Sequence, residues 1–202
     1  MLFRSDIHAG GEDLVFPHHE NEIAQSECCN GVPFAKYWMH NAFLNIDNRK
    51  MSKSLGNFRT VREIGEQYDL QVLRFFMLNA HYRSPLNFSA DLMESSKNAL
   101  ERITEAAARL RDRQAAATVQ EATEDEKKLM QEEAAFVTKF EESMDDDFNT
   151  ADALAAVFEL VKFANTNVQE GSSKEFAGHT LEVMTKLCDV LGLTLEKKEE
   201  IL

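Results

Sequence analysis

The chain has 202 residues, of which 44% are hydrophobic and 28% are charged, and its formal net charge is −13. Enough apolar surface is present to bury a sizeable core, and this excludes a disordered chain. No apolar run approaches the roughly 20 residues that cross a bilayer, so a membrane-spanning protein is excluded as well.

Charge is unevenly distributed along the chain. Residues 91–202 contain 13 basic and 25 acidic side chains, whereas residues 36–83 contain eight basic and four acidic ones. The positive balance of residues 36–83 favours contact with a polyanion. A solvated charged face explains the same counts, so charge alone does not decide between the two.

The cysteines indicate a reducing compartment. Cys28, Cys29 and Cys188 are odd in number and two of them are adjacent, so they provide no disulfide framework. Residues 1–5 are too short for a signal peptide, since no apolar h-region follows them. Both observations predict a cytoplasmic protein.

Up to about residue 88, short apolar runs lie between turn signals. Residues 14–16 and 42–46 are such runs, separated by Gly-Gly, Asn-Gly and Asp-Asn pairs. This arrangement is typical of strands that alternate with helices. The aromatic residues of this part are predicted to be core side chains, namely Tyr37, Trp38, Phe43 and Phe58.

Pro17 can begin a helix that carries His18 and Glu22. Because they are four residues apart, the two side chains project from one helix face, where an imidazole and a carboxylate can share a zinc ion. Zinc usually takes three or four ligands, so an ordinary solvated helix start is the competing interpretation. Cys29 lies about 16 Å beyond His18 along such a helix, out of bonding reach. Cys28 and Cys29 are therefore predicted to be packing residues.

The stretch Lys50-Met51-Ser52-Lys53-Ser54 places two ammonium groups and two hydroxyls in one short polar loop. These groups suit phosphate oxygens, because fixed lysines stabilise the charge that develops as pyrophosphate leaves. Lysines spaced in this way among serines are also common in solvated loops. The run alone is therefore not decisive.

Beyond residue 88 the apolar spacing is helical and forms four stripes. Their members are Leu92, Leu100, Ile103, Ala107 and Leu110; Leu129, Phe136, Phe140 and Met144; Leu154, Val157, Phe158 and Val161; and Phe176, Leu181, Met184, Leu187 and Leu191. Thr123 with Glu126 predicts a capping box for the second helix, and Gly192 suits the end of the fourth. Four amphipathic helices with short connections predict a bundle.

The run at 144–150 is rich in aspartate, but it does not have the ligand spacing and glycine of an EF-hand loop. Asp147 or Asn149 is instead predicted to cap the helix that follows. The carboxylates would then lie at the positive end of that helix.

Several separated motifs resemble those of cysteinyl-tRNA synthetases, a class I family, in order and spacing. They lie at 6–14, 17–26, 37–40, 50–54, 65–74, 81–84 and 144–150, and the run at 50–54 resembles the KMSKS signature. The family's HIGH-type motif and two upstream metal-binding cysteines are absent from this sequence. The resemblance therefore implies a fragment that lacks the N-terminal HIGH region and the C-terminal anticodon domain. We expect such a fragment to be inactive alone.

The resemblance implies an α/β part followed by an all-α part. Residues 6–60 would form the C-terminal part of a Rossmann-like class I catalytic domain with the KMSKS loop. Residues 61–88 would be a connecting segment. Residues 89–202 would be an antiparallel helix bundle of the DALR type that binds tRNA.

The activity that the resemblance implies is ATP-dependent activation of cysteine and its transfer to tRNA-Cys, by a monomeric enzyme without membrane contact. ATP would bind as a substrate together with magnesium. The catalytic residues would be Lys50, Ser52, Lys53 and Ser54. The nucleotide-binding residues would be His8, Gly10, Gly11 and Asp13, together with Lys53.

His18 and Glu22 would be two of four zinc ligands in an incomplete site. The substrate's own sulfur would bind this zinc, and a serine hydroxyl would be rejected because it is a far poorer ligand. His8 and His19 resemble histidines that line this pocket. Asp13 has a second interpretation, as the cap of the helix that Pro17 begins.

Two other functions stay open. A related ligase joins cysteine to an amino sugar in mycothiol synthesis and shares zinc and a KMSKS-like loop. A non-enzymatic tRNA-binding helical module is the other alternative. A gel-shift assay with tRNA separates the binding module from the mycothiol-type ligase.

Overall fold

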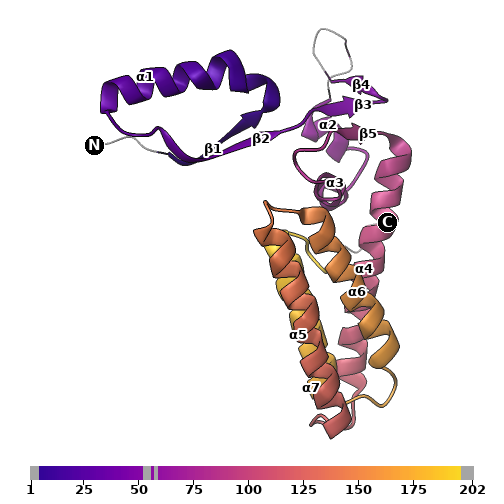
Figure 1. The fold of residues 1–202 in the computed structure, drawn as a ribbon. Coiled ribbons are helices and arrows are strands. Elements are labelled where there is room, and N and C mark those ends of the chain that lie inside the picture. The colour runs from indigo at the N-terminus through magenta and orange to yellow at the C-terminus, as the bar shows by residue number, and fades with distance from the viewer. Residues whose placement is uncertain (1–4, 52–55, 57–58, 197–202) are drawn as a thin grey trace. The chain divides into compact units, whose positions relative to one another are not determined.

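The structure is a computed structural model that describes residues 5–51, 56 and 59–196 (Figure 1). The chain divides into two compact units. The first unit comprises residues 1–58 and 82–89, and the second comprises residues 59–81 and 90–202. No helix in the described ranges is long and apolar enough to cross a membrane.

A strand–helix–strand crossover forms the beginning of the first unit. Strand β1 (Ser5–Gly11) pairs in parallel with β2 (Ala35–Asn41), and α1 (Glu20–Asn30) lies between them in sequence. Parallel strands need such a crossover because their ends lie far apart. Two short helical turns, η1 (Glu12–Leu14) and η2 (Val15–His19), lead from β1 into α1. Phe16 is extended, with φ −135° and ψ 132°, so the helical backbone that continues into α1 begins after it, at Pro17.

Alternate residues of β1 and β2 point to opposite faces of the pair. His8 lies opposite Trp38 in the register, and Ile7 lies opposite Tyr37. Ile7 and Tyr37 are 55% and 66% exposed, so the prediction that Tyr37 is a core residue is wrong. The reason is that a parallel pair needs cover on both faces, and the described residues provide little on the face of Ile7 and Tyr37.

A second, three-stranded sheet completes the first unit. Strand β3 (Leu44–Ile46) lies in its centre, antiparallel to β4 (Arg49–Lys50) and parallel to β5 (Leu86–Phe88). The β3–β4 connection is a two-residue turn at Asp47 and Asn48, where both φ angles are positive. Trp38 and Phe43 are half-buried. Phe58 lies outside the described residues.

The second unit is helical. Its elements are α2 (Val61–Gly65), α3 (Leu70–Leu78), α4 (Ala90–Ala116), α5 (Glu124–Asp145), α6 (Thr150–Asn167) and α7 (Lys174–Val190). The helices α4 to α7 run alongside one another as a bundle (Figure 1). The predicted apolar stripes supply much of its core, including Ile103, Leu154, Phe176 and Met184. Leu92 is an exception, because it is 44% exposed at the beginning of α4.

Local capping signals decide where these helices begin and end. Thr123 and Glu126 form the predicted capping box of α5. Asn149 caps α6 by accepting a hydrogen bond from the Asp152 amide at 3.2 Å, so the prediction is confirmed for Asn149. Gly192 follows α7 with φ +65°, which is the conformation that glycine favours after a helix.

The domain boundaries drawn from the sequence stay a prediction. In the structure, α2 and α3 belong to the same compact unit as the bundle, and β5 belongs to the unit of β1 to β4. Thr150 explains part of this grouping, because its hydroxyl donates to the Leu78 carbonyl at the end of α3, at 2.8 Å.

Candidate metal and nucleotide site

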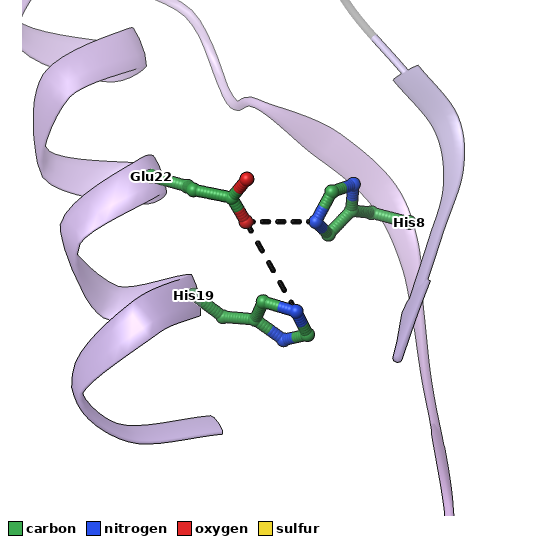
Figure 2. A group of neighbouring side chains, drawn as sticks. All are labelled: His8, His19 and Glu22. Carbon is green, nitrogen blue, oxygen red and sulfur yellow. Dashed lines mark hydrogen bonds and ion pairs between the residues drawn. The ribbon is translucent and has the colours of Figure 1, made fainter. Parts of the chain in front are cut away.

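Glu22 is the centre of a cluster of imidazoles in the first unit. Its Oε2 accepts a hydrogen bond from His8 Nε2 at 2.8 Å, and His19 Nε2 lies 4.0 Å from the same oxygen (Figure 2). Its Oε1 lies 3.6 Å from His18 Nε2. Helical periodicity brings His18, His19 and Glu22 together, since residues three and four apart are neighbours on a helix surface. His8 reaches them from β1.

His19 is the buried member of the cluster, with 3% of its surface exposed. Its Nδ1 lies 2.8 Å from His40 Nε2, so one of these two ring nitrogens donates to the other. Burial lowers the pKa of His19, and the neighbouring rings of His40 and His8 lower it further. A neutral imidazole at this place is suited to accepting or donating a hydrogen bond without added charge.

Trp38 forms an aromatic wall beside the histidines. Its ring centroid lies 4.9 Å from that of His8 and 5.2 Å from that of His19. The Trp38 and His40 rings are nearly parallel, with an interplanar angle of 9°. Trp38 and His40 are two apart on β2 and therefore share a face. That spacing was the sequence signal for His40, which the sequence prediction did not include among the site residues.

Two glycines allow the close approach of these groups at the end of β1. A Cβ atom on Gly10 would lie 2.9 Å from Leu14 Cδ1 and 3.0 Å from His19 Cε1. A Cβ atom on Gly11 would lie 2.6 Å from Asp13 Oδ1. Gly10 therefore lets the backbone lie against the buried His19 ring, whereas at Gly11 the exposed Asp13 carboxylate could rotate away from a Cβ atom.

The donor set fits part of a zinc site. Two ligand atoms bound to the same tetrahedral zinc at 2.0–2.1 Å lie about 3.4 Å from each other. His18 Nε2 and Glu22 Oε1 lie 3.6 Å apart, close to that separation. His8, His19 and Glu22 also form a group whose ligand atoms lie within 4.8 Å of one another. The predicted pair therefore has two further histidines next to it.

The remaining predicted residues are distributed as follows. Cys28 and Cys29 are exposed on α1, and the prediction that they are packing residues is wrong, because no side chain of α1 is buried in the described structure. Lys50 is the second residue of β4, the strand that follows the tight turn. The other three predicted catalytic residues, Ser52, Lys53 and Ser54, lie outside the described residues.

Comparison with known proteins shows which family the chain resembles. A family model described as the class I tRNA synthetase (C) catalytic domain matches residues 3–98, and a DALR domain model matches residues 139–196. A cysteine–tRNA ligase of Lachnospira eligens is 64% identical over 197 residues, and those of Lachnoclostridium phytofermentans and Clostridioides difficile are 58% and 51% identical over 202 and 197 residues. The chain belongs to the cysteinyl-tRNA synthetase family. Each alignment covers 98% of this chain but only 42% or 43% of the relative, so the chain spans less than half the length of these synthetases.

A solved structure supports the fold. The chain matches the crystal structure of the Agrobacterium radiobacter K84 agnB2 LeuRS–tRNA–LeuAMS ternary complex with a TM-score of 0.72 at 16% identity. The match covers 90% of this chain and 25% of the other. The predicted fold class, part of a class I catalytic domain followed by a DALR-type helix bundle, is confirmed.

Proposed function

We propose that the chain supplies the metal-binding and phosphate-binding parts of a cysteine–tRNA ligase. The observation that carries the proposal is the 64% identity to a cysteine–tRNA ligase over 98% of the chain. The reaction would have two steps. The cysteine carboxylate attacks the α-phosphate of ATP and releases pyrophosphate. A hydroxyl of the terminal ribose of tRNA-Cys then attacks the carbonyl carbon of the cysteinyl adenylate, an ester forms, and AMP leaves.

His18 and Glu22 would hold zinc in this proposal. The ion, when bound, supplies a soft Lewis acid to which a cysteine thiolate binds much more strongly than a serine hydroxyl. His18 is well placed for this role, because 59% of its side chain is exposed and can face a substrate. His8 would hold the other carboxylate oxygen of Glu22 and so orient it.

The nucleotide would be bound at the end of β1 and by the lysines after β4. Backbone at Gly10 and Gly11 can approach a ribose closely, and the Asp13 carboxylate can accept a hydrogen bond from a ribose hydroxyl. Lys50 and Lys53 would pair with phosphate oxygens, together with magnesium, and stabilise the charge on the departing pyrophosphate.

The helical unit would contact tRNA-Cys, as the DALR match to residues 139–196 suggests. The proposal also includes a cytoplasmic location, which the exposed and unpaired thiols of Cys28 and Cys29 favour. The complete parent enzyme would act as a monomer.

The test is complementation in trans. The chain is mixed with a polypeptide that supplies the remaining part of the Lachnospira eligens enzyme, and cysteine-dependent ATP–pyrophosphate exchange is measured. We expect exchange in the mixture and none with either polypeptide alone, because groups from both parts must converge on one nucleotide. A mixture with Glu22→Gln in the chain is the control for metal-dependent selection, and it should lose discrimination of cysteine from serine.

Exchange that is as strong with serine as with cysteine in the unmodified mixture would contradict the proposed selection. A complex that forms but never exchanges pyrophosphate would contradict the ligase function itself. A gel shift with tRNA-Cys against tRNA-Ser then tests whether the helical unit is a tRNA-binding module.

A further inference from the structure

The turn between β3 and β4 holds two residues in an unfavourable conformation. Asp47 has φ +48° and Asn48 has φ +62°. A two-residue type I′ turn requires this left-handed conformation at both positions. Residues other than glycine enter it at a cost, which is smaller for Asn and Asp but not zero. Contacts from outside the turn would offset this cost.

Strand β5 supplies those contacts from 39 residues farther along the chain. Ile46 and Arg49 pair across the hairpin, so the amides of the two turn residues have no partner within the hairpin. The Asp47 amide donates to the Phe88 carbonyl at 3.2 Å. The Asn48 amide donates to the side-chain oxygen of Asn87, Oδ1, at 2.8 Å. Because the donor is an N–H group, only the oxygen of the Asn87 amide can accept, and this fixes the orientation of that side chain.

We propose that Asn87 is a positioning residue that holds the Asp47–Asn48 turn and so fixes the course of the chain through Lys50 and Met51. The inference rests on the proposed function in one respect, since the KMSKS-like run that would bind phosphate begins at Lys50. A tight turn one residue before this run sets the direction in which the run starts. Catalytic groups need such support, because small errors in their placement reduce rates strongly.

The hairpin continues the same alignment beyond the turn. Lys50 pairs with Asn45 of β3, and the Met51 amide donates to the Leu44 carbonyl at 3.1 Å. Asn45 in turn stands opposite Asn87 in the parallel register of β3 and β5. Asn87 therefore lies on the strand that also borders the hairpin, and a displaced turn would change the pairing of Lys50.

The first arm of the test measures the turn itself in the full chain. Amide hydrogen exchange by NMR is compared between the unmodified chain, Asn87→Ala and Asn87→Asp. Loss of one hydrogen bond should speed exchange of the Asn48 amide by on the order of tenfold in Asn87→Ala, and Asn87→Asp should retain protection because it keeps an acceptor oxygen. Asn45→Ala, on the opposite strand position, is the matched control and should leave the Asn48 amide unchanged.

The second arm uses inorganic pyrophosphate as the probe. Its titration should shift the Met51 amide resonance in the unmodified chain, and the response should be several-fold weaker in Asn87→Ala. The double variant Asn87→Ala/Asn48→Gly should recover the response, because glycine adopts the left-handed conformation without the anchor. Its residue-48 amide should still exchange fast, since the acceptor is gone. If Asn87 were needed only for folding, Asn48→Gly would not restore the pyrophosphate response of the Met51 amide.

Two results would overturn the inference. One is an Asn48 amide that exchanges equally slowly with and without the Asn87 side chain. The other is a pyrophosphate response that stays unchanged in Asn87→Ala although the turn has been released. If the unmodified chain does not respond to pyrophosphate at all, the proposed phosphate-binding function is contradicted, and the exchange measurements still decide whether Asn87 anchors the turn.

Discussion

Glu133 is a buried carboxylate of the helical unit, and its ionisation should make the stability of that unit depend on pH. The side chain is 0% exposed on α5. It accepts a hydrogen bond from Thr180 Oγ1 at 2.6 Å and lies 2.9 Å from His179 Nδ1, both on α7. Burial raises the pKa of Glu133 above its usual value of 4.5, and the bonds to Thr180 and His179 oppose this only in part.

The direction of the effect follows from proton binding. The folded state holds this proton more tightly than the unfolded chain, so the group's contribution to stability is complete below pH 4.5 and is lost as the pH rises through the raised pKa. Each unit of pKa difference corresponds to about 1.4 kcal/mol in the free energy of unfolding. For a unit the size of residues 59–81 and 90–202, that is roughly 5 °C in melting temperature.

Glu133→Gln keeps the shape of the side chain and removes its titration. We expect the melting temperature of the variant minus that of the unmodified chain to increase from pH 4.5 upward. The helical circular dichroism signal is the measurement, since α4 to α7 dominate it. Carboxyl groups common to both proteins cancel in this difference. Glu132→Gln, one residue away and exposed, is the matched control and should give a flat difference.

Truncation tests the packing at the same position. In Glu133→Ala, Thr180 would still donate to the Phe176 carbonyl at 3.1 Å, and the partly exposed His179 can bond to water. The cost should therefore come mainly from the void, about 2–3 kcal/mol or roughly 10 °C. A flat pH profile for Glu133→Gln, or an alanine variant as stable as the unmodified chain, would refute the reasoning.

Three further outcomes are expected. Burial raises the pKa of Cys188 to about 12, so a thiol reagent at neutral pH should modify Cys28 and Cys29 in the folded chain and Cys188 only after unfolding. Three thiols reacting at once would contradict this. Gly10→Ala should displace the His19 ring, because the new Cβ would lie 3.0 Å from His19 Cε1. Zinc binding should weaken by on the order of 10–100-fold, measured by titration against a chromophoric chelator. Unaltered zinc affinity would contradict a role of the His19 ring in supporting the zinc ligands. The helical unit should retain slow amide exchange under conditions in which the β1–β2 pair has lost it, because nearly all buried apolar side chains of the described residues belong to the helical unit. Uniform protection would contradict this expectation.

The parts of the fold that could be predicted from the sequence depend on neighbours within one turn of helix. The Thr123–Glu126 capping box and the Asn149 cap are local patterns, and the structure confirms both. The apolar stripes predicted the bundle for the same reason, because helical periodicity determines which side chains share a face.

Burial depends on what packs against a residue from far along the chain, and here the sequence was insufficient. Glu133 follows another glutamate on α5 and was not predicted to be buried, yet Thr180 on α7 provides its partner 47 residues away. Tyr37 looked like a core aromatic and is exposed. Cys28 and Cys29 were assigned to packing on an α1 helix that buries no side chain in the described structure.

The candidate metal site depends both on local helix spacing and on contacts between residues far apart in the sequence. His18 and Glu22 share a helix face, and this part was visible in the spacing of four. His8 reaches Glu22 only through the strand–helix crossover, which brings together residues 14 apart on two elements. The two carboxylate oxygens of Glu22 therefore have different partners. Oε2 is hydrogen-bonded to His8, and Oε1 faces His18. A carboxylate with one oxygen already held has less freedom to lose when its other oxygen takes a ligand. The residue that sequence spacing could not link to Glu22 is thus the one that orients it.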